Sequence, residues 1–424
     1  MALPSTLPPQ IVSEIPGPRS RALAQRLIGV ESRNVTCVVP EPPIFWERAM
    51  GANVWDVDGN RFVDLGGGFG VANAGHGHPR IVEALSEQAG RLLHAMGDVH
   101  PPAVKVELLE ALVEKFPGGG PARVVLGSSG SDAVEVALKT ALVATGRPGV
   151  VAFEGAYHGL GMGALDATWR PFFKEPFRAR LPGLTAFARY GDASDARRVG
   201  RESAAPIGAV LVEPVQGRGG ERVPPRGFLR ELRALCDEEG WLLVADEVYT
   251  GFGRTGRWFA CDHEDVVPDL LCVGKGLTSG LPLSACIGRA EVMDAWPRSG
   301  GEAIHTQTFL GNPALCAAAL ASLRVLEEEK LTNRAAELGE RALAFLASAA
   351  TSSRIVQCRG LGLMLGIECD SSQTAGAACG SALSRGLILL PCGDDGRVLS
   401  LTPPLCIDGD LLMASLETLL QCIP

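Results

Sequence analysis

The chain has 424 residues, of which 46% are hydrophobic and 21% charged, values typical of a globular protein with two or three domains. Its formal net charge of −9 argues against nucleic acid and anionic membrane surfaces as partners, and no apolar run approaches the length of a membrane span. The 12 cysteines lack the spacing of a zinc site, and the N-terminus lacks the features of a secretory signal, so we expect a cytoplasmic protein without a bound metal.

The N-terminal segment predicts an arm followed by a β-hairpin. Residues 1–20 are rich in Pro and Ser, which is typical of an extended arm, and residues 21–30 can form a short helix. The stretch 46–65 alternates apolar and polar residues around Asp58-Gly59, a strong turn signal. A glycine-rich passage over residues 66–77 follows the hairpin.

The middle of the chain alternates between helical and strand patterns. Helical periodicity occurs over residues 80–95, 103–115, 127–141 and 226–239, and short apolar runs typical of buried strands occur at 122–126, 150–153, 207–212, 241–245 and 270–273. This alternation predicts a doubly wound α/β domain with a mainly parallel sheet, which we place at residues 70–310.

The C-terminal segment predicts a smaller α+β domain. Helices are expected at residues 313–329 and 332–349, and short strands alternate with helices after them. We assign residues 311–424 to this small domain and expect the arm and hairpin of residues 1–69 to join it.

Two of the predicted strands deliver an acid and a lysine. Asp246 follows the run 241–245, and Lys275 comes just after the run 270–273. Ligand sites of parallel sheets lie at the carboxyl ends of the strands, so both side chains should face one crevice. A lysine in an apolar site is a nucleophile toward carbonyls, and a neighbouring carboxylate can keep a pyridine nitrogen protonated. The pair therefore indicates a pyridoxal phosphate (PLP) site, with an ordinary ion pair as the alternative.

Other strand ends carry residues that such a cofactor could use. Gly130 and Ser131 open a helix whose N–H groups can cradle a phosphate, although a simple helix cap would show the same pattern. Tyr157 could stack on a flat ring beside His158, or could lie at the edge of the core. Glu213 follows another strand and could line the site or cap a loop.

On these residues the chain resembles the class III aminotransferases, PLP-dependent enzymes of fold type I with a large and a small domain. The resemblance covers about residues 16–405 and rests on S-S-G-S-D-A-V-E-V-A-L-K, A-Y-H-G, V-E-P-V-Q-G, V-A-D-E-V-Y-T-G-F-G-R-T-G, G-K-G-L-T-S-G and T-F-L-G-N-P. It implies a homodimer with shared active sites. It also implies ping-pong transfer of an amino group from an amine or (omega-)amino acid to a 2-oxo acid such as pyruvate, as in omega-transaminases.

The resemblance also implies roles for single residues. Lys275 would form the Schiff base (aldimine) with PLP and then move the proton, and Asp246 would pair with the pyridine nitrogen. The remaining cofactor contacts would be the two ring neighbours Val248 and Tyr157, the phosphate ligands Gly130, Ser131 and, from the partner subunit, Thr308, and the lining residues His158 and Glu213.

The substrate side departs from the family pattern. Ser400 stands in L-S-L-T-P-P-L where many relatives have an arginine that grips the α-carboxylate, and a hydroxyl cannot replace a guanidinium. Either another cation, Arg218 or Arg170, takes over, or the pocket accepts amines without a neighbouring carboxylate. Phe69 would then contribute an apolar wall.

Two other functions compete with the transaminase. An amino-acid racemase or epimerase on the same scaffold would need the same lysine, but would turn over one amino acid without an oxo-acid acceptor. A non-catalytic relative that keeps the fold for binding would be expected to have lost Lys275 or Asp246, and both are present.

Overall fold

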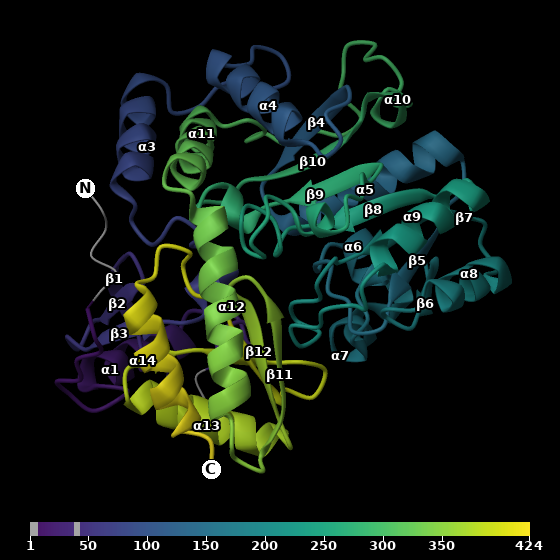
Figure 1. Ribbon diagram of the computed structural model, residues 1–424. Helices are drawn as coiled ribbons and strands as arrows, with labels where there is room; N and C mark the ends of the chain where they lie inside the picture. Colours follow the sequence, from purple (N-terminus) through teal and green to yellow (C-terminus); the bar gives the residue numbers. More distant parts are fainter. Residues whose placement is uncertain (1–6, 38–42) are drawn as a thin grey trace.

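The computed structural model describes residues 7–37 and 43–424 and is built around one large sheet (Figure 1). The order of its strands is β4-β10-β9-β8-β7-β5-β6, and all are parallel except β10, which is antiparallel to both neighbours. The strands are β4 (Ala122–Gly127), β5 (Gly149–Phe153), β6 (Thr185–Ala188), β7 (Ile207–Val212), β8 (Leu242–Asp246), β9 (Leu270–Val273) and β10 (Ser284–Arg289). The predicted doubly wound, mainly parallel sheet is confirmed, and the sequence pattern missed β6 and β10.

Helices cover both faces of this sheet because its central strands are apolar throughout. Every residue of β7 and β9 is buried, which is typical of parallel strands with two covered faces. Helix α5 (Gly130–Thr145) packs on one face, and α8 (Ala193–Glu202) and α9 (Phe228–Glu239) contribute to the apolar cluster on the other. The sheet therefore holds its strand ends in fixed positions.

Two smaller sheets combine both ends of the chain. One has the order β1-β2-β3-β13 and the other β11-β12-β15-β14. Asp58-Gly59 turns between β2 and β3 as predicted, and β13 pairs in parallel with β3, so residues near 387 lie beside the N-terminal hairpin. The strands are β1 (Trp46–Met50), β2 (Asn53–Asp56), β3 (Arg61–Asp64), β11 (Ile355–Leu361), β12 (Met364–Cys369), β13 (Leu387–Ile388), β14 (Leu390–Cys392) and β15 (Val398–Leu401).

The remaining helices complete the fold. They are α1 (Pro18–Ile28), α2 (Gly67–Gly70), α3 (Pro79–Arg91), α4 (Ala103–Lys115), α6 (Met162–Ala167), α7 (Pro171–Lys174), α10 (Ala290–Met293), α11 (Pro313–Glu328), α12 (Leu331–Ala349), α13 (Ser372–Ser384) and α14 (Gly409–Leu420). Helix α1 begins inside the predicted arm, whose first six residues lie outside the described part of the chain. Among the described residues, no helix combines the length and the apolar character that crossing a membrane requires.

The packing of α11 bears on the expected boundary at residues 310 and 311. This helix lies against α3 and α4, as Figure 1 shows near the top of the view, whereas α12 and α13 pack on β11 or β12 and α14 packs on α12 and α13. Helix α11 thus packs on α4, which itself packs on β4 of the large sheet, although we assigned residues 311–424 to the small domain. We propose that the division between the large and small domains falls between α11 and α12.

A fully buried arginine ties three distant segments together. The guanidinium of Arg254, from the motif G-F-G-R-T-G, donates to the carbonyls of Leu363 (2.9 Å) and Pro403 (2.6 Å) and to Oδ1 of Asn73 (2.8 Å). Because buried acceptors without donors are costly, this residue joins the large sheet to the C-terminal segment.

We expect Arg254→Met to lower the free energy of unfolding by about 3 kcal/mol, because it leaves several buried acceptors without a donor. Urea unfolding followed by circular dichroism measures the change. Arg226→Met is the matched control, since Arg226 is exposed and its loss should change stability by no more than about 0.5 kcal/mol. Equal midpoints for the two variants would contradict this role of Arg254.

Candidate active site

The residues predicted at the strand ends meet at one edge of the large sheet. Asp246 is the last residue of β8, and Lys275 begins the short 3-10 turn Lys275–Leu277 after the neighbouring β9. Glu213 follows β7, and Tyr157 and His158 follow β5. Contacts join these segments across the edge, because the N–H of Tyr157 donates to Oε2 of Glu213 at 3.0 Å, and His158 reaches Asp246.

Asp246 is held from two sides. Its Oδ2 lies 2.7 Å from Nδ1 of His158, and its Oδ1 accepts the N–H of Val248 at 3.1 Å. Both members of the pair are buried, with Asp246 5% and His158 3% exposed, and Nε2 of His158 has no partner among the described residues. The backbone N–H of His158 donates to Thr168. The carboxylate therefore has a fixed orientation at the strand end.

Lys275 lies in a desolvated position next to several acids. Burial lowers the pKa of its ammonium to about 8, although the charges of Asp246, Glu213 and Glu221 oppose the shift. Its Nζ lies 4.0 Å from the centroid of the Tyr249 ring. Its backbone has a φ of 40°, a conformation that non-glycine residues adopt rarely and mostly at functional sites. The lysine is thus a ready nucleophile at pH values near neutral.

The start of α5 presents backbone donors beside this pair. Ser129 is the N-cap and forms a capping box with Asp132, so Ser131 lies inside the helix and does not cap it. The N–H groups of Gly130 and Ser131 lie in the first helical turn, where the helix supplies no acceptors, and such termini bind anions. A Cβ on Gly130 would lie 2.6 Å from Cγ1 of Val248, so only glycine fits there.

A cavity of about 330 Å³ opens beside Tyr249. Phe69, Arg170, Arg218 and Ser400 all line it, so the structure brings the four expected substrate residues together. Its complete lining is Gly66, Phe69, Arg170, Gly217, Arg218, Glu221, Tyr249, Leu390, Pro391, Cys392, Gly393, Gly396, Ser400 and Thr402.

The two arginines lie on the aromatic side of this cavity. The guanidinium carbon of Arg218 is 4.9 Å from the centroid of the Tyr157 ring and 5.6 Å from that of Phe173. Arg170 donates to the carbonyl of Asp394 at 2.7 Å. Phe69 is 64% exposed and can form an apolar wall.

Ser400 contacts an acid that the sequence did not single out. Its hydroxyl donates to Oε1 of Glu221 at 2.5 Å, and Glu221 is only 1% exposed. Burial raises the pKa of Glu221 to about 8 and that of Glu213 to about 7. In the sequence, Glu221 is distinguished only by its place three residues after Arg218, and this is too weak a signal to predict a contact with Ser400.

Thr308 lies apart from the strand ends. It is exposed, on the loop that precedes α11, and its neighbour Gln307 accepts from Oγ of Ser128 at 2.8 Å, beside the start of α5.

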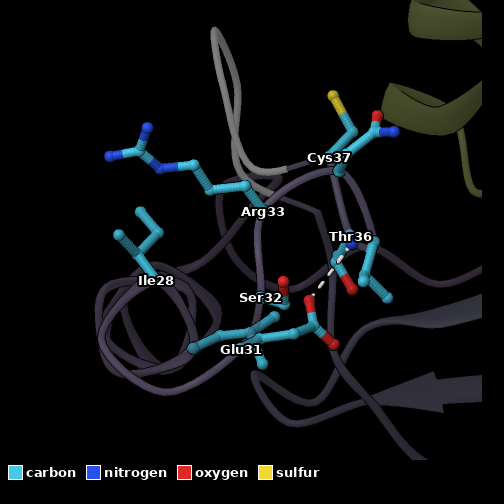
Figure 2. A pocket seen from close by; sticks show the side chains of 9 residues that line it. Ile28, Glu31, Ser32, Arg33, Thr36 and Cys37 are labelled. Carbon is cyan, nitrogen blue, oxygen red and sulfur yellow. Dashed lines mark hydrogen bonds between the residues drawn. The ribbon is translucent and has the colours of Figure 1, made fainter. Parts of the chain in front are cut away.

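A second hollow does not belong to this site. It measures about 360 Å³ and lies beside the end of α1, where Glu31 accepts the N–H of Thr36 at 3.1 Å (Figure 2). Its lining comes from residues between 27 and 37. None of the strand-end residues contributes to it.

Comparisons with known proteins agree with this geometry. The family model for aminotransferase class-III matches residues 36–423. The chain is 40% identical to the 4-aminobutyrate aminotransferase of Mycobacterium tuberculosis, with 96% of each chain covered. It is 39% identical to the 5-aminovalerate aminotransferase of Pseudomonas aeruginosa, over 90% of this chain and 93% of that one. A solved ornithine aminotransferase from Toxoplasma gondii, with PLP at partial occupancy in its active site, superposes with a TM-score of 0.88 at 30% identity, covering 95% of this chain and 94% of that one.

The low pKa of Lys275 predicts its reactivity. In protein stripped of bound small molecules, acetylation of Lys275 should be half-maximal near pH 8, because only the deprotonated amine reacts and a lowered pKa moves deprotonation to lower pH. Peptide mass mapping across a pH series measures this, with exposed Lys330 in the same digest as the internal control. Labelling of Lys275 that begins only near the ordinary lysine pKa of about 10.4 would contradict the desolvated position.

Proposed function

Because this chain belongs to the class III aminotransferases, we propose that it transfers an amino group from an amine or ω-amino acid to a 2-oxo acid such as pyruvate. The transfer would run as two half-reactions of a ping-pong cycle. The observation that carries the proposal is the arrangement at the edge of the large sheet, where a desolvated lysine lies beside a carboxylate that a buried histidine orients.

The enzyme is a PLP-dependent transferase, and the residues at the strand ends fit that cofactor. The anion-binding start of α5 suits a phosphate, the buried Asp246 suits a protonated ring nitrogen, and the nucleophilic Lys275 suits an aldehyde. When bound, PLP supplies an electron sink for negative charge that develops on the substrate carbon. The close contact between Gly130 and Val248 supports Val248 as one ring neighbour, and we propose Tyr157 as the other.

The chain's own residues would then orient the reaction and move protons. His158 holds Asp246 through Nδ1 and so fixes the orientation of the Asp246 carboxylate. Lys275 would hold the cofactor and, once released, would carry a proton at Nζ to and from the substrate carbon. Glu213, fixed by the N–H groups of Tyr157 and Gly217, would line the site.

The cavity supports a donor without a carboxylate next to its amino group. Ser400 is engaged with Glu221 and supplies no positive charge, whereas Arg218 and Arg170 lie against the aromatic rings of Tyr157 and Phe173. A carboxylate remote from the reacting amine could reach those arginines, as in an ω-amino acid. Two relatives of this chain carry the names of 4-aminobutyrate and 5-aminovalerate aminotransferases, which supports the same donor class.

Half-reactions test the proposal directly. A simple aryl-alkyl amine or an ω-amino acid should change the visible absorbance of the loaded enzyme, and pyruvate should reverse that change. Lys275→Ala is the inactive control.

Two outcomes would contradict parts of this proposal. Conversion of one enantiomer of an amino acid to the other, without any oxo acid, would favour the racemase. Strict dependence on an α-amino acid together with 2-oxoglutarate, lost in Arg218→Ala, would exclude the amine donor and support Arg218 as a substitute for the missing arginine.

We also propose a homodimer in which Thr308 contributes to the phosphate site of the partner subunit. Exposed apolar side chains lie on the Thr308 loop, Ile304 (69%) and Phe309 (64%), and on the neighbouring segment that includes Leu93 (65%) and Met96 (55%). Exposed apolar side chains that gather on one face are typical of a protein–protein interface.

Subunit mixing should reveal the shared site. A mixed dimer of Lys275→Ala and Thr308→Ala chains contains one site with both residues intact, so coexpression with two different tags should restore activity that neither variant has alone. Mixing Lys275→Ala with Asp246→Asn is the matched control, since both residues belong to the same strand edge and no complete site can form. A fully active monomer in sedimentation would exclude the shared site.

A further inference from the structure

One carboxyl group in the cavity has an oxygen without a partner. Glu221 is 1% exposed, and its Oε1 accepts from Ser400, but its Oε2 has no hydrogen-bond partner among the described residues. Its backbone has a φ of 50°, a strained conformation for a residue other than glycine. A buried carboxyl oxygen without a hydrogen-bond partner lowers the stability of the fold unless a ligand donates a hydrogen bond to it.

No side chain in the described part of the chain forms an ion pair with Glu221. The guanidinium of Arg254 contributes charge at a distance but is committed to two carbonyls and to Asn73. Arg218 lies over Tyr157 instead. The cavity therefore combines an unmatched acid on one wall with arginines on another.

Tyr249 lies between Lys275 and the wall of the cavity that includes Ser400 and Thr402. Nζ of Lys275 lies over the Tyr249 ring, and the Tyr249 hydroxyl lies 3.2 Å from Oγ1 of Thr402, on the wall that also includes Ser400 and Glu221. Glu221 is also close enough for its charge to raise the pKa of Lys275, so a donor whose reacting amino group lies at Lys275 can extend through the cavity toward Glu221.

We propose that Glu221 is a specificity-determining residue that binds a second, positively charged amino group of the donor, so that diamines and diamino compounds are preferred over monoamines. The proposal rests on the proposed aminotransferase function. An ammonium group supplies the hydrogen-bond donors that Oε2 lacks, whereas an alkyl end leaves this oxygen unpaired and a carboxylate would be repelled. Burial raises the pKa of Glu221 to about 8, and a bound cation would lower this pKa because it favours the ionised carboxylate.

The test compares kcat/KM for 1,4-diaminobutane with that for butylamine, with pyruvate as acceptor, in the loaded enzyme. We expect the wild type to prefer the diamine by about tenfold or more, mainly through KM, since charged hydrogen bonds contribute that much to binding. In Glu221→Gln the ratio should fall close to one. In Ser400→Arg it should also fall, because the new guanidinium would pair with Glu221.

The matched control is Glu368→Gln. Glu368 lies on β12, outside the cavity, and pairs with Arg359, so its loss should leave the diamine preference unchanged. Thermal unfolding of each variant identifies any variant that does not fold. Even if a variant fails to fold, the ratio of the two kcat/KM values in the wild type tests the proposal.

Equal kcat/KM values for the two amines in the wild type would overturn the proposal, as would a preference that persists in folded Glu221→Gln. Loss of the preference in Glu368→Gln would also overturn it. Absence of turnover with every amine and amino acid would instead contradict the proposed function, and this inference with it.

Discussion

The site depends on two parallel strands that end side by side. Strands β8 and β9 pair in register, so Asp246 and Lys275 leave the sheet at the same edge. Because both strands are buried by helices on both faces, their ends cannot move relative to each other without disturbing the core. Close approaches reinforce this rigidity, since Gly130 packs directly on Val248. A lysine and an acid held on rigid strands are pre-organised for chemistry in a way that loop residues are not.

Burial and neighbouring charges have opposite effects on the pKa of Lys275 at this edge of the sheet. Desolvation lowers the pKa of Lys275, while the nearby carboxyl groups raise it, and desolvation prevails. The same burial raises the pKa of Glu213 and Glu221, so these acids lose part of their charge near neutral pH and oppose the shift of the lysine less strongly. The lysine can therefore remain a nucleophile although it is surrounded by acids.

The acidic and basic side chains of the cavity lie at different places in its lining. Ser400 supplies a hydroxyl where the family pattern expects a cation, and this hydroxyl is used to hold Glu221. Positive charge lies instead on Arg218 and Arg170, which rest against aromatic rings. A pocket with acid and base on separate walls discriminates by the spacing of charges on the substrate as well as by its shape.

Local patterns were sufficient to predict the strands that carry the chemistry. Continuous apolar runs bounded by charge predict β8 and β9, and ligand sites of parallel sheets lie at the carboxyl ends of the strands, so the sequence predicts that Asp246 and Lys275 lie together. The turn at Asp58-Gly59 and the helices α3, α4 and α12 follow from equally local signals. Such features depend on residues close in sequence, so the sequence by itself determines them.

Only the tertiary structure decided which distant residues meet. His158 and Asp246 are 88 residues apart, and Glu221 and Ser400 are 179 apart. The pairing of β13 with β3, the position of α11 against α3 and the three contacts of Arg254 are of the same kind. These contacts depend on the paths of loops, and on single strained residues such as Glu221, whose conformations no hydrophobic period encodes. The sequence therefore specified the strand ends, and the packing of the whole chain specified what surrounds them.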